Sequence, residues 1–347
     1  MAMASKIASN MKYRFLGDSG LLVSALSFGC MTFTSDDQVD EAYEILVHAY
    51  KHGINFWDTA EAYGDGISES VTGKALARGV EGVWTREDLV VSTKLFIGTK
   101  DGPNARGLSR KHLVEGTKAS LQRLGVDYVD VLFCHRFEEY TPIEEIVRSM
   151  NFIIDQGWAF YWGTSDWHES DILRACEIAD RLGLIRPVVE QPEYNLFNRS
   201  KVEVEFAALY TKYKMGLTTW SPLAFGILTG KYAQGVPEDS RLFSGWWKTT
   251  VGDPSERAAQ VEKLRPIAAE LGCSLAQLAI AWCLSRPILS TVMLGAKTIK
   301  QLQENLDAFH VADKITPEIQ EKIEATIPFT YNAPTRDYLF TIRKAFL

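Results

Sequence analysis

Short apolar runs alternate with helix-patterned stretches along nearly the whole of this sequence. The first apolar run is at residues 26–29. Residues 39–50 then carry apolar side chains at the spacing of an amphipathic helix, and Gly53 marks the end of that helix. The run at 129–135 is almost unbroken, which is typical of a strand buried on both faces. Strands are predicted at residues 26–29, 55–58, 89–94, 129–135, 159–163, 188–191, 216–220 and 291–294. Helices are predicted at residues 39–50, 69–78, 110–124, 143–154, 169–182, 202–213, 258–271, 275–284 and 299–309.

Eight strand–helix units in one chain predict an α/β fold of the (β/α)₈ barrel type, because a doubly wound sheet would more often stop at about five to seven strands. No shift in composition marks a linker, so residues 1–347 are expected to form a single domain, with a core over about 11–327 and a tail over 328–347. A hairpin over residues 13–20 is expected to plug the barrel bottom. The long segment from residue 224 to about 255 is the expected lid, because irregular loops of that length are usually functional.

The charge balance excludes a general electrostatic attraction to nucleic acid or anionic membranes. The chain has 37 basic and 44 acidic residues, for a net charge of −7, so a few local cations must hold any anionic ligand. The sequence has no signal-peptide core and no apolar run near the ~18 residues of a membrane span. Five cysteines without a CxxC pair favour buried reduced thiols. We therefore expect a cytoplasmic protein.

Two patterns that could indicate other chemistry are weak. His48 and His52 are four residues apart on a predicted helix, but they lack the HExxH form and a third ligand, so we expect a helix face and no metal. The GILTGK segment at residues 226–231 has the wrong spacing for a P-loop, and Tyr232 stands where Ser or Thr is required. The sequence has no GxGxxG motif. A nicotinamide cofactor would therefore have to be bound by barrel loops.

Titratable side chains stand at the ends of three consecutive predicted strands. Asp58 ends the second strand, Lys94 the third and His135 the fourth, and Tyr63 follows in the loop that Asp58 opens. Barrel enzymes place catalysis at the carboxyl ends of their strands, so these four side chains are expected to converge on one rim. Each alone has an ordinary structural explanation, such as a helix cap or an ion pair. Their combination predicts an active site.

The four residue types suit the reduction of a carbonyl group. A phenol titrates near pH ~10 in water, and a nearby ammonium makes it a stronger acid. Lys94 can supply that ammonium, while Asp58 holds Lys94 charged and in place. His135 can hydrogen-bond the carbonyl oxygen and orient it. Tyr63 can then protonate that oxygen while a hydride donor reduces the carbon.

Longer segments of the sequence resemble one known family, the aldo-keto reductases. They are NFWDTAEAY (55–63), LVVSTK (89–94), GVDYVDVLFCHR (125–136) and WSPL (220–223). A second set is similar to the voltage-gated potassium-channel β subunits and their plant homologues: GLSRKHLVE (107–115), AFYWGTS (159–165), VEQPEYN (189–195), CSLAQLAIAWCL (273–284) and QLQEN (301–305). The resemblance runs from about residue 11 to residue 327. It implies a TIM barrel that binds NADPH and a small carbonyl substrate, with the four strand-end residues as a catalytic tetrad.

The resemblance also implies which residues bind the cofactor. Ser165 and Gln191 would hold the carboxamide, Trp220 would stack near the nicotinamide ring, and Lys231 and Arg241 would clamp phosphates. The full set is Met31, Asp58, Ser165, Gln191, Trp220, Ser221, Pro222, Leu223, Ala224, Phe225, Lys231, Arg241, Gly295, Lys297, Gln301, Glu304 and Asn305. Barrel core for Trp220 and a solvated helix face for the last three residues remain alternatives.

Lys297 stands just after the last predicted strand, beside the start of a helix whose backbone N–H groups favour an anion. Together with Arg241 it is the expected partner of the 2′-phosphate that distinguishes NADPH from NADH. Ordinary surface charges are the alternative for both residues.

The sequence departs from the animal channel subunits at two positions. Those subunits typically carry Asn at the position of His135, so the histidine favours catalysis. They also carry a basic residue at the position of Asp166, which puts a phosphate contact there in doubt. The first hypothesis is an NADPH-dependent reductase of aldehydes or ketones. The second is a regulatory channel subunit whose bound cofactor senses redox state, and the fourfold rings of such relatives imply a homotetramer.

Overall fold

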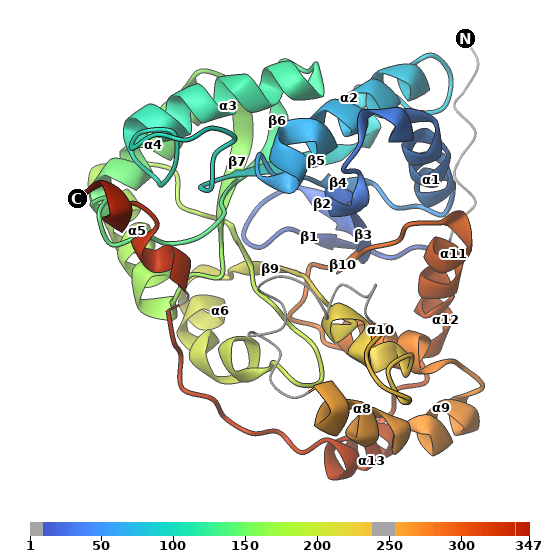
Figure 1. Cartoon of the computed structure of the whole chain (residues 1–347). Helices are drawn as coiled ribbons and strands as arrows, with labels where there is room; N and C mark the ends of the chain where they lie inside the picture. Colours follow the sequence, from blue (N-terminus) through green and yellow to red (C-terminus); the bar gives the residue numbers. More distant parts are fainter. Residues whose placement is uncertain (1–9, 238–253, 337) are drawn as a thin grey trace.

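The structure of the chain, a computed structural model, describes residues 10–237, 254–336 and 338–347. Within these ranges, eight parallel strands close into a barrel in which the last strand pairs with the first (Figure 1). The strands are β3 (Leu26–Gly29), β4 (Phe56–Asp58), β5 (Val90–Leu95), β6 (Val129–Cys134), β7 (Ala159–Ser165), β8 (Val189–Gln191), β9 (Gly216–Thr219) and β10 (Thr291–Leu294). This closed barrel confirms the predicted fold class.

Helices surround the barrel, as Figure 1 shows. Their bounds are α1 (Val39–Lys51), α2 (Ile67–Val80), α3 (Arg110–Leu124), α4 (Ile143–Asp155), α5 (Glu169–Leu182), α6 (Ala207–Tyr213), α8 (Pro254–Glu262), α9 (Arg265–Leu271), α10 (Leu275–Leu284), α11 (Ile299–Asp307), α12 (Phe309–Ala312) and α13 (Pro317–Thr326). The sequence did not predict α13.

Two helices that were predicted as continuous are interrupted. In the helix predicted at residues 202–213, Lys201–Glu205 forms a π-helical turn and α6 begins only after it. The helix predicted at 258–271 is divided into α8 and α9, and Pro266 lies at the start of α9. Proline lacks the backbone N–H that would continue the hydrogen bonds of a helix. It is tolerated in the first turn, so Pro266 explains why a new helix begins here.

The N-terminal hairpin closes the bottom of the barrel, as predicted. It consists of β1 (Tyr13–Phe15) and β2 (Leu22–Ser24). Leu16 and Val23 belong to a buried cluster with side chains inside the barrel, among them Phe56 and Phe133. At Gly17, φ is +58° and an added Cβ would lie 2.2 Å from the backbone oxygen of Val188, so only glycine fits under the barrel. The hairpin does not cover the opposite end of the barrel, where the carboxyl ends of the strands lie.

The predicted lid is only partly described. Its first part, Ala224–Thr229, is a 3₁₀ segment that is kinked at Phe225 and Gly226, and residues 238–253 lie outside the described residues. In the described part of the chain, no single helix is long and apolar enough to cross a membrane, and α9 with α10 meets that test only as a pair bent by 76°.

Candidate active site

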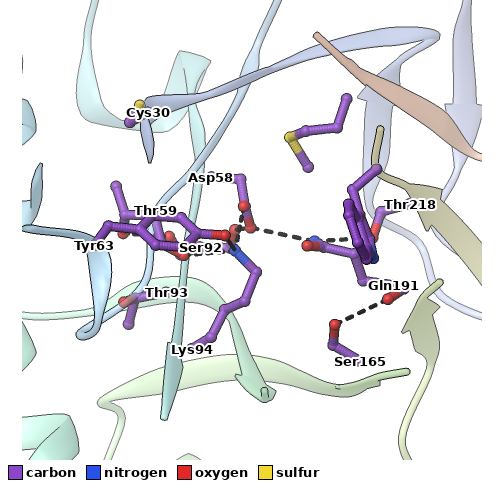
Figure 2. Close-up of polar contacts among 12 residues, drawn as sticks. Cys30, Asp58, Thr59, Tyr63, Ser92, Thr93, Lys94, Ser165, Gln191 and Thr218 are labelled. Atoms are coloured by element: carbon purple, nitrogen blue, oxygen red, sulfur yellow. Dashed lines mark hydrogen bonds and ion pairs between the residues drawn. The ribbon is translucent and has the colours of Figure 1, made fainter. Parts of the chain in front are cut away.

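Lys94 is the centre of the candidate site. Its side chain is fully buried on β5, and its ammonium donates a hydrogen bond to Asp58 Oδ2 at the end of β4 (Figure 2). The same Nζ donates to the backbone oxygen of Thr59 at 2.8 Å and to the hydroxyl of Tyr63 at 3.2 Å. Ser92 lies two residues before Lys94, on the same face of β5, and donates to Asp58 Oδ1 at 2.6 Å. The structure therefore joins three of the four predicted residues in one hydrogen-bonded group.

The charge on Lys94 is stabilised by its neighbours. Burial by itself lowers the pKa of this ammonium, but the negative charge of Asp58 and the contact with Tyr63 raise it above its ordinary value. Lys94 therefore carries a positive charge at neutral pH. Such a charge lies 3.2 Å from the Tyr63 hydroxyl, where it would favour a negative charge on that oxygen.

His135 completes the group at the end of β6. Its ring meets that of Tyr63 edge-on, with centroids 5.9 Å apart and an interplanar angle of 84°. Burial, together with the positive charges of Arg136 and Lys94, holds the pKa of His135 well below its ordinary value. Its Nδ1 is buried and has no hydrogen-bond partner among the described residues. The imidazole is therefore neutral and has unused hydrogen-bonding capacity.

The turn that carries Tyr63 has an unusual backbone. Gly64, Asp65 and Gly66 have positive φ angles of 56°, 52° and 93°. A Cβ on Gly66 would lie 2.7 Å from Cδ of Arg123, so glycine is needed where α3 packs against the turn. The guanidinium of Arg123 is itself held by an ion pair with a buried glutamate of α2. Helix packing thus fixes the turn that positions the tyrosine.

The ends of β7 and β8 bring Ser165 and Gln191 together, and Gln191 contacts the carboxylate of Asp58. The Gln191 side-chain amide donates to Asp58 Oδ1 and to the hydroxyl of Thr218, both at 3.3 Å (Figure 2). The Ser165 hydroxyl donates to the backbone oxygen of Gln191 at 2.9 Å. These bonds occupy the amide N–H groups of Gln191, and its side-chain oxygen remains to accept from a bound donor.

The loop after β9 contains a run of left-handed backbone. The φ angles of Ser221, Ala224, Phe225 and Gly226 are 56°, 46°, 58° and 93°. Strained backbone of this kind gathers at functional sites, and the N–H groups of such turns form concave sites for anions. An added Cβ on Gly226 would lie 2.8 Å from Nζ of Lys231, so the lysine lies directly over this turn. The side chain of Ala224 is buried, so this residue can contribute only its backbone.

The far end of the cleft lies beyond β10 and at the start of α11. Lys297, Gln301 and Glu304 are exposed there, whereas Asn305 is buried and donates to the backbone oxygen of Gly295 at 3.3 Å. Gln301 Oε1 accepts from the backbone N–H of Lys297 at 2.8 Å. The side-chain amides of Gln301 and Asn305 therefore hold the backbone at this end of the cleft, and Lys297 is exposed there.

One cleft of about 1150 Å³ joins these groups at the carboxyl ends of the strands. The predicted residues that line it are Met31, Asp58, Tyr63, His135, Ser165, Gln191, Trp220, Ser221, Pro222, Leu223, Phe225, Lys231, Gly295, Lys297, Gln301, Glu304 and Asn305. Lys94 lies behind Tyr63 and Ala224 is buried, so neither lines the cleft. Arg241 lies outside the described residues.

Sequence analysis missed the contribution of the C-terminal tail to this cleft. Arg336 and Phe340 line it, and the ring of Phe340 stacks on Phe137 with centroids 5.9 Å apart. Arg343 makes a two-pronged ion pair with the fully buried Glu138, with both distances at 2.9 Å. The composition of the tail could have predicted this contribution, because aromatic and basic residues are numerous in residues 328–347 and a tail exposed only to solvent is seldom rich in aromatic residues.

The histidine pair of α1 makes ordinary contacts. His48 Nε2 is 2.8 Å from the side-chain oxygen of Gln303, and His52 Nδ1 is 2.8 Å from the backbone oxygen of His48. Across the described ranges, no three His, Cys, Asp or Glu side chains gather as metal ligands could.

The barrel and the site together define a class of protein. A (β/α)₈ barrel with a tyrosine, a buried lysine–aspartate pair and a neutral histidine at its carboxyl end has the layout of a barrel enzyme that carries out acid–base chemistry. The model of the aldo/keto reductase family matches residues 25–327, and the chain belongs to that family of NAD(P)H-using oxidoreductases.

Two similar proteins are each named "Probable voltage-gated potassium channel subunit beta". The one from Arabidopsis thaliana is 54% identical over 321 residues, which cover 91% of this chain and 97% of the relative. The one from Oryza sativa subsp. japonica is 52% identical over 321 residues, with the same coverage of both chains.

Proposed function

We propose that this protein is an NADPH-dependent reductase of aldehydes and ketones. The observation that carries the proposal is the Tyr63 hydroxyl in the cleft, 3.2 Å from the buried ammonium of Lys94. We further propose that residues 1–347 work as one barrel domain in the cytoplasm.

The cleft fits a nicotinamide dinucleotide. Its volume of about 1150 Å³ lies just above the ~300–1,000 Å³ range of small-ligand pockets. Ser165 and Gln191 would hold the carboxamide, and the left-handed turn with Lys231 would hold the phosphates. Lys297, Gln301 and Asn305 would hold the adenosine end. When bound, the cofactor supplies a hydride.

The protein's own residues would hold and protonate the carbonyl group. His135, neutral because of its low pKa, donates an N–H to the carbonyl oxygen and orients it. The proton that this oxygen receives resides on the Tyr63 hydroxyl, so Tyr63 is the general acid. Lys94 stabilises the resulting phenolate, and Asp58 keeps Lys94 in place. Tyr63 and His135 touch the substrate, whereas Lys94 acts through Tyr63.

The substitution Tyr63→Phe tests the proposal. It removes the acidic proton and keeps the ring, so kcat for aldehyde reduction with NADPH should fall by about 10²-fold or more while NADPH binding stays nearly unchanged. Tyr161→Phe, on β7 in the barrel-bottom cluster, is the matched control and should keep the parental rate. Parental turnover in Tyr63→Phe would mean that another group donates the proton.

A second candidate function is that of a regulatory subunit of a voltage-gated potassium channel, with bound NADP(H) as a redox sensor. The names of the relatives at 54% and 52% identity favour it. The two functions are compatible in one molecule. Co-purification of the tagged chain with a potassium channel from the same organism tests this candidate, and a channel that elutes separately at micromolar concentrations counts against it.

The second candidate also predicts a homotetramer. Light scattering at micromolar concentration should give four times the chain mass of 38.9 kDa. A monomer would remove the channel-subunit function and leave the reductase.

A further inference from the structure

Asp166, the residue after β7, connects the loops that follow four neighbouring strands. The indole N–H of Trp220, just after β9, donates to Asp166 Oδ2 at 3.2 Å. The guanidinium of Arg136, just after β6, is 3.2 Å from the same oxygen. Asp166 Oδ1 accepts from the backbone N–H of Glu193, after β8, and from Nζ of Lys201, both at 3.3 Å. One carboxylate thus gathers four donors in the wall of the cleft.

The backbone of Asp166 is arranged for this position. Its φ angle of 55° is left-handed, a conformation that aspartate tolerates better than most residues. Its N–H donates to the backbone oxygen of Gln191 at 3.2 Å, and its own carbonyl accepts from Lys201 at 3.0 Å. Burial opposes ionisation, but the charges of Lys201 and Arg136 hold the pKa of this carboxyl below its ordinary value. Asp166 is therefore a carboxylate at neutral pH.

The residues that Asp166 holds are those of the proposed nicotinamide subsite. Trp220 lines the cleft and is the expected neighbour of the nicotinamide ring. Arg136 donates to the hydroxyl of Ser165 at 3.2 Å, and that hydroxyl donates to the backbone oxygen of Gln191. Without the carboxylate, the indole N–H would lose its acceptor, and two cations would face each other across the floor of the cleft.

We propose that Asp166 is a positioning residue that fixes the indole of Trp220, and with it the floor of the nicotinamide subsite. The inference rests on the proposed function, because that function assigns Trp220 and Ser165 to the cofactor. Asp166 also lines the cleft, and the role that we propose for it is exerted through these neighbours. A basic residue at this position would repel Arg136 and Lys201 and could not accept from the indole, so it would require a different arrangement of this floor.

The experiment compares Asp166→Asn with Asp130→Asn. Asp130 is a matched control, because it is a similarly buried carboxylate that pairs with Arg86 at 2.7 Å and accepts the backbone N–H of Val91 at 2.8 Å, and it does not line the cleft. The full chain is labelled with 5-fluorotryptophan, and Trp220→Phe identifies the Trp220 resonance. In the cofactor-free protein, Asp166→Asn should move that resonance and Asp130→Asn should leave it in place.

Calorimetric titration with NADPH gives the second readout. The Kd should rise about tenfold in Asp166→Asn and less than twofold in Asp130→Asn, while kcat at saturating NADPH changes less than threefold. In the Trp220→Phe background, Asp166→Asn should raise the Kd for NADPH by less than a further threefold. The contact between the indole and the carboxylate is already absent in that background.

An unmoved Trp220 resonance, or a parental Kd in Asp166→Asn, overturns the inference. A parent protein that binds no NADPH overturns the proposed function instead, and the resonance still shows whether Asp166 fixes the indole. Should Asp166→Asn not fold while Asp130→Asn does, Lys201→Met takes its place. It removes a second donor to the same carboxylate and should shift the Trp220 resonance by a smaller amount, and an unmoved resonance there overturns the inference as well.

Discussion

The two ends of the cleft are built differently. At the catalytic end, the ammonium of Lys94 is fully buried and bonds to Asp58, Thr59 and Tyr63. Away from that end, Lys231 over the left-handed turn after β9 and Lys297 at the far end are exposed. Buried and bonded charges keep their geometry before any ligand arrives, whereas exposed charges are hydrated and screened until a ligand displaces the water. In the proposed function, the chemistry would therefore rely on a preformed group, and cofactor discrimination would rely on contacts completed on binding.

The largest expected difference between the two ends concerns stability. Lys94→Met leaves the carboxylate of Asp58 buried without a counter-charge, so the free energy of unfolding should fall by about 3–5 kcal/mol. Lys231→Met makes the same change at an exposed site and should alter that free energy by less than about 0.5 kcal/mol. Urea denaturation of both variants measures the difference.

A double substitution sharpens this result. Asp58→Asn combined with Lys94→Met should recover much of the stability lost in Lys94→Met, because no uncompensated charge remains in the interior. An equal decrease in the free energy of unfolding in Lys94→Met and Lys231→Met would show that the two ends do not differ as we describe.

The next effect concerns affinity at the exposed end. If Lys297 binds the 2′-phosphate, Lys297→Met should weaken NADPH binding by about 1.5–3 kcal/mol, the scale of a charged hydrogen bond, and barely change NADH binding. Lys300→Met is the matched control, because Lys300 is exposed on α11, three residues after Lys297, and does not line the cleft. Quenching of tryptophan fluorescence follows both titrations. Equal losses for the two cofactors would mean that Lys297 supports the loop and not the phosphate.

The smallest effect is a pH dependence of the catalytic end. His135 has a folded-state pKa well below its ordinary value, so the folded protein binds fewer protons than the unfolded chain in mildly acidic solution. Stability from this group is therefore present above the unfolded value of about 6.5 and is lost as pH falls. Down to pH ~5 the loss is at most about 2 kcal/mol, since one pKa unit equals about 1.4 kcal/mol.

The comparison of His135→Asn with His310→Asn measures this contribution. Removing the imidazole should flatten the decline of Tm between pH ~7 and pH ~5, whereas His310→Asn, on the exposed face of α12, should leave the parental slope. A parental slope in His135→Asn would show that this histidine accepts a proton in the folded state as easily as in the unfolded chain.

The sequence predicted the strands better than the longer helices. Leu26–Gly29 and Thr291–Leu294 form strands with the predicted bounds, because a short apolar run between helical segments of a barrel has few alternatives. The helix predicted at residues 258–271 breaks at Pro266, although its apolar spacing continues.

What the sequence by itself determined is the barrel and the four residues at its strand ends. Alternating periodicity specifies strand and helix locally, and eight parallel strands connected by helices close in one way, which brings Asp58, Lys94 and His135 to one rim. Only the tertiary structure decided which groups act together across long separations. Asp166 bonds to Trp220, and Glu138 pairs with Arg343, 205 residues away. Such pairs leave no periodic signal, because they depend on the distances between loops that only the closed barrel sets.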